Sequence, residues 1–437
     1  STASSGSGDN GLTMVVNGVT STVTTENSRI ATGLFKGNGT HDGATAQAKK
    51  VNTFRIGVLD GYSFSQGSEA TDVTINEAGA TPNRGSKRFN DSLPPAEWSF
   101  STYVRPFKHG TNSWREAGDM DMVENILWAS MAGKDITDGS LTGTSAPAVT
   151  VDSTDADVSF IRSEHHELLK LSIFFALENT TYRLNDAQVN QCEIDFSIDG
   201  IAQLSWSGNA TTIDQVVTAI EDPSKALHCK PTGTDASVTT ATYVEGYNYA
   251  DSTGPDDADY LRNKLSTLTL VAEAQGGGNA SGGLDARTYD INITGGSITI
   301  ANNVTYVTPE TLGVIDKPIG SFTGARQVTG SLTCYLDTKD NGSNQLLSDM
   351  AAATDLVSNS FDMSLFMGGA SGATSVVEFD IPKAHLQVPT LETGDLISTS
   401  VEFSAHGTDL LTGDEMTIKY KGVTAHTDAQ YATDYTV

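Results

Sequence analysis

An internal repeat constrains the fold of this chain more than any other sequence feature. The segment TYRLNDAQVNQCEIDFSIDGIAQLSWSG starts at Thr181, and EFDIPKAHLQVPTLETGDLISTSVEFSA starts 197 residues later (378 − 181). The two segments align without a gap, and their apolar positions coincide while their polar positions differ. Such a pattern predicts two copies of one domain that share the same core positions.

Earlier segments repeat as well. FRIGVLDG at 54–61 matches YDINITGG at 289–296, and WSFSTYVRP at 98–106 matches VTGSLTCYL at 328–336. The second pair alternates apolar and polar residues with the period of a half-buried strand. The first pair ends in Asp60-Gly61 and Gly295-Gly296, dipeptides that tolerate positive φ, so a two-residue hairpin is expected at each.

Each copy is expected to contain a single helix. In the first copy Asp119 is the candidate N-cap, and apolar residues recur at helical spacing from Val123 to Met131. In the second copy Ser343 precedes a similar run that includes Leu346 and Met350. The predicted fold is therefore mainly β, with each domain an antiparallel β-sandwich or half-barrel that carries one helix.

The repeat also predicts domain limits and a shared core. The first domain is expected at 1–221, with a long acidic insertion forming a loop near 131–165. An interdomain linker at 222–258 and a second domain at 259–437 follow. The predicted core positions of the repeat are Trp98, Val104, Leu127, Ile194, Leu204, Trp206, Ile291, Ile293, Leu332, Leu391, Val401 and Phe403.

Composition limits the classes of partner. The net charge is −28, so the chain should on average repel nucleic acid and anionic membranes. This acidity serves either solubility, as in a salty habitat, or a surface that lies beside DNA without holding it. The three cysteines lack C-x-x-C spacing, and no apolar run approaches the length of a membrane span. A reduced cytosolic site of assembly, with no membrane partner, is expected.

No motif for catalysis, cofactor binding or metal binding stands out. The G-x-G-x-x-G match at 6–11 neither follows a strand nor opens a helix, as a dinucleotide site requires. His165 and His166 are adjacent and diverge, so they are poorly placed to share one metal ion. The acidic clusters lack the spacing of a calcium loop. We therefore expect a protein that is not an enzyme and has no cofactor.

Four segments carry a resemblance to a known family. They are PPAEWSFSTYVRP at 94–106, VENILWASMAG at 123–133, VNQCEIDFSIDGIAQLSWSGNA at 189–210 and SITIANNVTYVTPETLGVIDKPIGSFTG at 297–324. Together they resemble the tail tube proteins of siphophages, the long-tailed bacteriophages, over roughly 25–220 and 260–437. The duplication is similar to the variant that carries two tandem tube domains in one chain.

The resemblance implies that the sheets join into a ring-shaped β-barrel, which three copies would close as a pseudo-hexameric ring. Rings would stack into a tube whose acidic channel lets genomic DNA pass without specific binding. Implied partners are further copies and the tail tip or initiator, tape-measure and terminator proteins. The implied location is the virion tail, assembled in the host cytoplasm. Implied channel-lining strands lie in 54–66, 98–105 and 189–207 and in 289–300, 328–336 and 386–404.

Other classes remain open from sequence alone. Another virion structural protein, such as a capsid decoration protein or a tail terminator, would share the β-rich composition. A carbohydrate-binding or adhesin protein made of two β-sandwich modules would share the acidity. The latter class should show exposed aromatic platforms, whereas Trp98, Trp128 and Trp206 occupy alternating or helical positions typical of a core.

Overall fold

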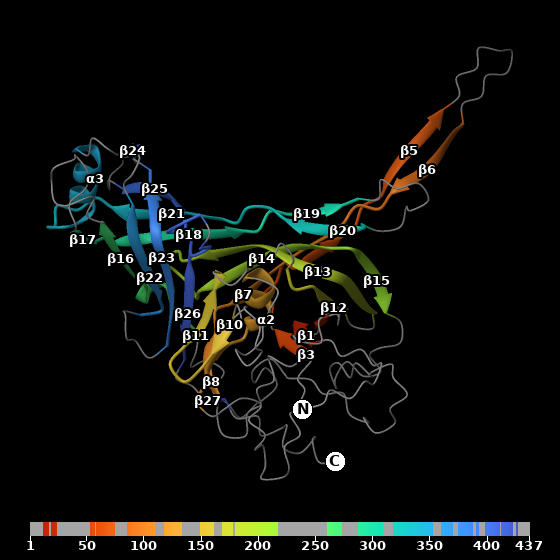
Figure 1. The fold of residues 1–437 in the computed structure, drawn as a ribbon, viewed down its shortest axis with the longest axis horizontal. Coiled ribbons are helices and arrows are strands. Elements are labelled where there is room, and N and C mark those ends of the chain that lie inside the picture. The colour runs from red at the N-terminus through yellow and green to blue at the C-terminus, as the bar shows by residue number, and fades with distance from the viewer. Residues whose placement is uncertain are drawn as a thin grey trace, which may run out of the picture.

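The structure is a computed structural model, and it is mainly β, as predicted (Figure 1). In the residues it describes, the α-helices are α2 (Asn125–Ala132) and α3 (Ser343–Ala352). A short 3-10 turn spans Asn263–Leu265. The described residues are 12–16, 19–23, 53–56, 58–74, 85–109, 118–132, 149–160, 168–177, 180–216, 260–272, 287–308, 318–352, 360–369, 375–387, 390–392, 398–410, 412–422 and 425–426.

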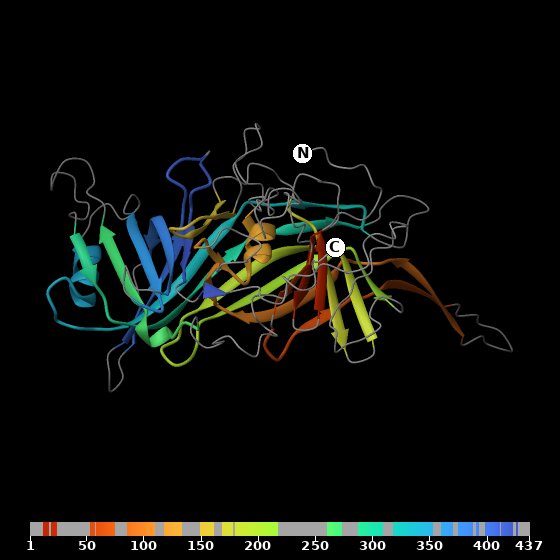
Figure 2. The same ribbon diagram turned by 90° about the horizontal axis from the view of Figure 1, so that it is seen from below.

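One antiparallel sheet runs through both halves of the chain (Figures 1 and 2). The first half contributes four strands and the second half another four, and β13 pairs with β18 where the halves meet. We call these eight strands the central sheet. In order across it they are β4 (Ser63–Ser65), β7 (Ala96–Tyr103), β14 (Gln203–Ala210), β13 (Thr180–Asp195), β18 (Ile293–Ala301), β21 (Gln327–Tyr335), β25 (Ser398–Ala405) and β24 (Thr390–Glu392).

The strand registers of the two halves correspond. Trp98 lies opposite Gly208 between β7 and β14, and Val328 lies opposite Ala405 between β21 and β25. The sequence repeat aligns Trp98 with Val328 and Gly208 with Ala405, so both pairs have the same register. Phe64 and Ile300 lie opposite Trp98 and Val328, respectively, so β4 corresponds to β18. These registers agree with a duplicated domain, although the domain limits themselves stay a prediction.

A gap-free alignment fails at one hairpin. Gly208 lies opposite Val189, but its counterpart Ala405 lies opposite Ala384, the counterpart of Ala187. The two hairpins thus differ in register by two residues. Because strand side chains alternate with a period of two, a shift of two keeps every apolar residue on the core face. The sequence pattern therefore conceals the shift.

Two further groups of strands form the second layers. In the first half these are β1 (Leu12–Val16), β2 (Val19–Val23), β3 (Thr53–Ile56), β12 (Leu171–Leu177), the start of β13 and β15 (Thr212–Val216). The layer over the second half contains, in order across it, β17 (Arg287–Asp290), β16 (Thr267–Ala272), β22 (Phe361–Met367), β23 (Val376–Leu386) and β26 (Thr417–Lys421). Two strands of the first half, β11 (Ala156–Ser159) and β10 (Val149–Val151), extend this layer beyond β26.

Three smaller units complete the fold. A three-stranded sheet contains β8 (Pro106–His109), β9 (Met120–Met122) and β27 (Ala425–His426). One hairpin, β5 (Glu69–Thr74) with β6 (Ser86–Ser92), projects far from the body of the molecule in both ribbon views. A second hairpin, β19 (Val304–Val307) with β20 (Gly320–Thr323), lies beside the central sheet.

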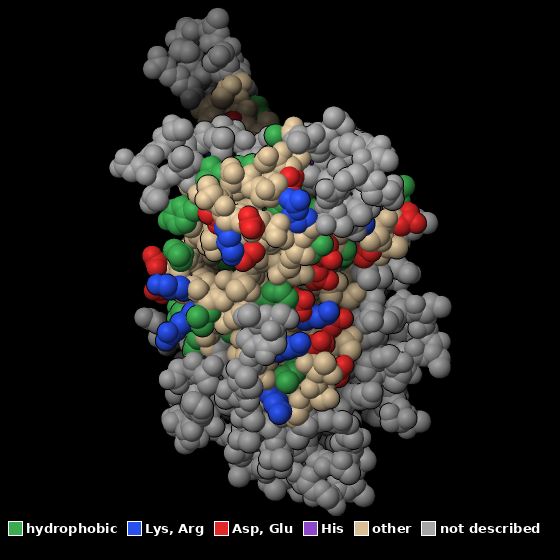
Figure 3. Space-filling model, turned by 90° about the vertical axis from the view of Figure 1, so that its left-hand side faces the viewer, with side chains coloured by type: hydrophobic (Ala, Val, Ile, Leu, Met, Phe, Trp, Pro, Cys, Tyr) green, Lys and Arg blue, Asp and Glu red, His purple; other side chains and the backbone are tan. Residues whose placement is uncertain are grey.

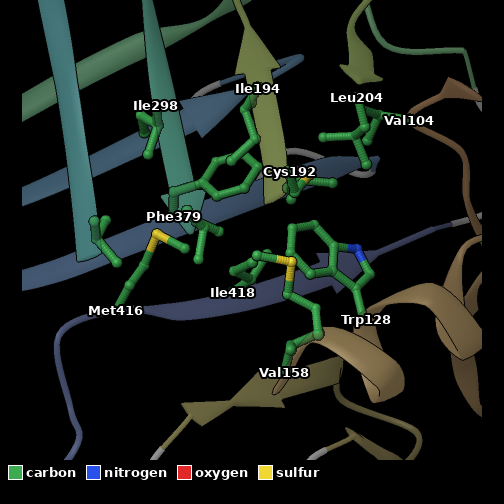
Figure 4. Close-up of a cluster of buried hydrophobic side chains, with 14 of the residues drawn as sticks. Val104, Trp128, Val158, Cys192, Ile194, Leu204, Ile298, Phe379, Met416 and Ile418 are labelled. Carbon is green, nitrogen blue, oxygen red and sulfur yellow. The ribbon is translucent and has the colours of Figure 1, made fainter. Parts of the chain in front are cut away.

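The layers enclose one continuous hydrophobic core to which both halves contribute (Figure 4). Trp128 from α2 and Cys192 from β13 meet Phe379 and Ile418 from the second half. Of the predicted core positions, Ile293 is half-buried against this core, and Leu391 lies in β24, where its side chain is not described. The others are buried: Trp98, Val104, Leu127, Ile194, Leu204, Trp206, Ile291, Leu332, Val401 and Phe403.

The predicted acidic loop at 131–165 is wrong in its middle part. Residues 149–159 form the β10–β11 hairpin, and β11 pairs with β26 of the second half. Ala156 and Val158 are fully buried and Phe160 is almost so, at alternate positions of the strand. The acidic residues between them mask this period-2 pattern, which is why the sequence predicts a solvated loop. Instead, the β10–β11 hairpin connects the two halves through its pairing with β26.

In the described residues each half contains one α-helix, but the predicted cap of the first is wrong. Helix α3 begins at Ser343, as expected. Helix α2 begins at Asn125, and Asp119 lies before the intervening strand β9. The buried Asp121 carboxylate instead accepts hydrogen bonds from the Met122 amide (2.8 Å) and the Asn125 side chain (2.7 Å). Every residue of α2 is buried, because strands of both halves surround it.

Neither predicted two-residue hairpin forms. Gly61 (φ +96°) does sit in a turn, but the strands it joins, β3 and β4, pair with β1 and β7 instead of with each other. Gly295 and Gly296 lie inside β18, next to a bulge in its pairing with β21. A Cβ on Gly296 would lie 2.6 Å from the Phe196 ring. Gly296 therefore serves close packing of the Phe196 ring onto the strand.

Gly296→Ala is expected to destabilise the protein by about 1–3 kcal/mol, the usual cost of overpacking. The added methyl group must displace the Phe196 ring or separate β18 from β21, because it meets both. Gly320→Ala is the matched control, since a Cβ there has no heavy atom within 4 Å. The measurement is chemical unfolding of both variants beside the parent protein. Equal loss of stability in the two variants would contradict the packing role.

Candidate functional site: the polar face of the central sheet

The central sheet has one apolar face and one polar face. Successive side chains of a strand point to opposite sides, so residues that alternate with the buried ones share the outer face. That face consists mainly of hydroxyl and carboxylate side chains. We call it the polar sheet face, and its main members are Ser63, Glu97, Ser99, Ser101, Glu193, Asp195, Ser205, Ser207, Ser297, Thr299, Thr329, Ser331, Ser400, Glu402 and Ser404.

Neighbouring strands bring these side chains into rows. The Ser63 and Ser99 hydroxyl oxygens are 2.9 Å apart, and those of Ser101 and Ser205 are 3.0 Å apart. The row through Ser205 continues across Glu193 to Thr299, and so crosses from the first half into the second. Cross-strand hydroxyl pairs of this kind support the strand register without adding charge.

The charge on this face is of one sign. Glu97, Glu193, Asp195 and Glu402 are all exposed, whereas the described strands β4, β7, β14, β18, β21 and β25 and residues 190–195 of β13 contain no lysine or arginine. The α3 end of the molecule differs, because both signs of charge mix there (Figure 3). Arg287 pairs with Asp349 at 2.8 Å at that end. The polar sheet face therefore presents a negative potential unbalanced by local cations.

A buried polar cluster lies beneath the sheet, between the two halves. The Trp128 indole of α2 donates a hydrogen bond to the Tyr420 hydroxyl of β26 at 2.8 Å. Burial raises the pKa of the neighbouring Glu124 to about 8, and Tyr420 and Arg105 only partly oppose this rise. Burial also raises the pKa of Cys192 well above its ordinary value, so its thiol is not an activated nucleophile. This cluster joins the halves and offers no reactive group to a substrate.

Other groups considered from sequence do not form a site in the described part of the chain. The Asp152 carboxylate caps its own turn by accepting from the amides of Thr154 (2.6 Å) and Asp155 (3.2 Å). No set of three or more His, Cys, Asp and Glu side chains among the described residues is arranged to hold a metal ion. No described helix has the length and apolar character needed to cross a membrane. Outside the described residues lie 6–11, His165, His166, Cys229, 222–258 and Asp259.

The strands of the polar sheet face largely lie in the ranges that the family resemblance implies for the channel, but the side chains on this face were not identified from sequence. The overall acidity suggested a surface beside DNA, but the carboxylates that form it were not identified. The informative pattern is serine or threonine at two or more alternate positions in each of β7, β14, β18, β21 and β25, without an intervening cation. Only the strand pairing shows that these positions form a single surface across both halves.

The phage tail tube protein family matches the chain over residues 127–405. The chain is also similar to the tail tube protein pb6 of Escherichia phage T5, with 37% identity over 369 residues that cover 84% of this chain and 70% of that protein. The chain therefore belongs to the phage tail tube protein family. It is a structural component of a virion tail and not an enzyme, which confirms the resemblance drawn from sequence.

Proposed function

We propose that three copies of this chain close into a ring by pairing β24 of one copy with β4 of the next, and that the rings stack into a tube. The polar sheet face lines the channel, through which genomic DNA passes without specific binding. The observation that carries this proposal is the β13–β18 junction, where the chain already joins two tube-like sheets edge to edge. The same junction, made between copies, generates a closed ring.

The two ends of the central sheet support this geometry. In the described residues β4 pairs only with β7, and β24 pairs only with β25, so each has an edge available for hydrogen bonding. In the register of the repeat, β4 corresponds to β18. Strand β24 corresponds to the end of β13, because it follows β23 along the chain as the end of β13 follows the start of that strand. Open sheet edges favour pairing with another chain, and closure of a ring removes them.

The charge of the polar sheet face supports the channel role. Among the described side chains, each chain places four exposed carboxylates there: Glu97, Glu193, Asp195 and Glu402. Binding of DNA relies on neutralisation of its phosphates by cationic side chains, and the face offers none. A negatively charged wall lets DNA move along the channel without stopping. The remaining partners are the tail tip or initiator, tape-measure and terminator proteins, with assembly in the host cytoplasm.

A cysteine pair tests the ring junction. Glu193 lies opposite Thr299 within the chain, and the repeat places Thr390 and Ser63 at the corresponding positions. In a Cys229→Ser background, Ser63→Cys with Thr390→Cys should be cross-linked between copies by a short bismaleimide. Such a flexible linker also bridges a slip of two residues, about 7 Å along a strand. Denaturing gels of tails from infected cells should show a ladder that stops at three chains.

The matched control is Glu193→Cys with Thr299→Cys, which should cross-link within one chain and leave its mass unchanged. Electron microscopy of the same tails should show stacked hollow rings with threefold symmetry. A ladder that stops at two chains, or that continues far beyond three, would contradict the closed three-copy ring.

A further inference from the structure

The β19–β20 hairpin shows how one half of the molecule is held by the other. The Tyr306 hydroxyl lies 3.0 Å from the Asp186 carbonyl oxygen and 3.1 Å from that of Asn209. Asn190 accepts a 2.7 Å hydrogen bond from the Val304 amide through its side chain. The hairpin leaves the second half and packs across β13 and β14 of the first, on the side of the β13–β18 junction.

The β5–β6 hairpin occupies the corresponding place in the first half. It connects β4 to β7 as β19–β20 connects β18 to β21. In the register of the repeat, the Glu69–Ser92 pair at its base falls where Thr305 pairs with Phe322. Every residue of β5 is exposed, and the hairpin projects away from the rest of its own chain (Figures 1 and 2). The surface that would receive it lies at the other end of the central sheet.

That surface is the counterpart of the one that holds β19–β20. In the repeat, the counterparts of Asp186, Gln188, Asn190 and Asn209 are Lys383, His385, Gln387 and His406. The two-residue shift described above moves positions along the strands but keeps them on the same surface. We call these four the acceptor surface. Lys383 and His385 are half-buried, and Gln387 and His406 are exposed. It brings a lysine and two histidines together in a chain of net charge −28.

We propose that the base of the β5–β6 hairpin, residues 69–71 and 90–92, packs on the acceptor surface of the neighbouring copy in the same ring. This inference rests on the proposed ring and deepens it by naming a second contact at each junction. The occupant is a second copy of this chain, since the contact repeats between copies what β19–β20 does within one.

Charge complementarity favours this arrangement. At the base of the hairpin, the Glu69 carboxylate accepts a 2.6 Å hydrogen bond from the Ser92 hydroxyl, and Asp91 accepts one from the Thr71 hydroxyl. Neither of these hydroxyl bonds neutralises a carboxylate, so both negative charges can face the Lys383 ammonium group and the imidazole N–H donors of the acceptor surface. Farther along the hairpin, Asp72 is already paired with Arg88 at 2.8 and 2.9 Å. The unbalanced negative charge therefore lies at the base.

Charge reversal tests the contact. Glu69→Lys with Asp91→Lys should raise the concentration at which half of the protein forms three-copy rings by about tenfold or more, equivalent to about 1.4 kcal/mol. Lys383→Glu with His406→Glu should do the same. All four substitutions together should restore ring formation to within about threefold of the parent protein, because opposite charges again face each other. Mass photometry over a concentration series measures all three.

The control exchanges the internal pair as Asp72→Arg with Arg88→Asp, which keeps the charge and fold of the hairpin. It should form rings at the parent concentration. Normal rings in the Glu69→Lys, Asp91→Lys variant would overturn the contact while leaving the ring intact, and so would rings that form but fail to stack. Failure of the fourfold variant to recover would also overturn it. Absence of three-copy rings in the parent protein would instead refute the ring itself.

Discussion

Lysines placed on the polar sheet face should convert the channel from a passage into a DNA-binding surface. The informative variant combines Ser101→Lys, Thr329→Lys and Ser400→Lys, on three different strands with none of the positions directly opposite another. Each added cation that contacts a phosphate releases counterions. The slope of log affinity against log salt therefore steepens by about 0.9 per contact with duplex DNA. With several lysines in every ring, infectivity should fall by orders of magnitude.

The measurement is retention of duplex DNA by assembled tubes at low and at physiological salt, together with plaque formation after complementation. The matched control carries asparagine at the same three positions, which alters size and hydrogen bonding but not charge. It should retain no DNA and should complement infection. Tubes of the lysine variant that assemble normally, retain no DNA and remain infectious would contradict the assignment of this face to the channel.

Stability should fall as the pH rises from about 5 to about 8, and Glu124→Gln should abolish this fall. The pKa of Glu124 is about 8 in the folded protein, against 4.5 for the ordinary carboxyl group. Between these values the folded state keeps a proton that the unfolded state has lost, so the free energy of unfolding decreases with rising pH. The slope for a single group is about 1.4 kcal/mol per pH unit, which amounts to several kcal/mol across the window.

Glutamine has nearly the shape of protonated glutamate and cannot ionise, so the Glu124→Gln variant should be the more stable protein at pH 8 and nearly unchanged below pH 4.5. Glu193→Gln, on the exposed polar sheet face, is the control that removes one carboxylate without touching the buried cluster. Urea unfolding of the three proteins across this pH range makes the comparison. A parent stability that rises with pH through the window, or a Glu124→Gln variant with the parent's slope, would refute a buried neutral carboxyl group.

The core of this protein could be predicted from sequence because the repeat reports each position twice. Trp206 and Phe403 differ in side chain but occupy the same place in β14 and β25, and both are buried. The positions of α2 and α3 followed from helical spacing in the same way. The candidate site was predictable only in part. The absence of lysine and arginine from these strands can be read from the sequence, but the pairing that joins the strands of both halves into one surface cannot.

The errors have a common physical origin. Asp119 had the chemistry of an N-cap, and Gly295-Gly296 had the chemistry of a turn, but competing tertiary contacts used them differently. Residues 149–159 looked solvated because aspartates separate their apolar residues, yet β26 offered a strand edge that buried them. Local propensity contributes about 1 kcal/mol or less per residue, so a packing partner readily overrides it.

The sequence by itself determined a mainly β chain, the period-2 strands, the repeated core positions, and a set of sheet strands without lysine or arginine. Tertiary structure alone decided that β13 pairs with β18, that β10–β11 joins β26, and that Glu124 is buried between the halves. Backbone hydrogen bonds between strands are the same for every residue type except proline, so side-chain identity does not specify which edges meet. The pKa of Glu124 likewise depends on what surrounds the carboxyl group, and groups distant in sequence supply those surroundings.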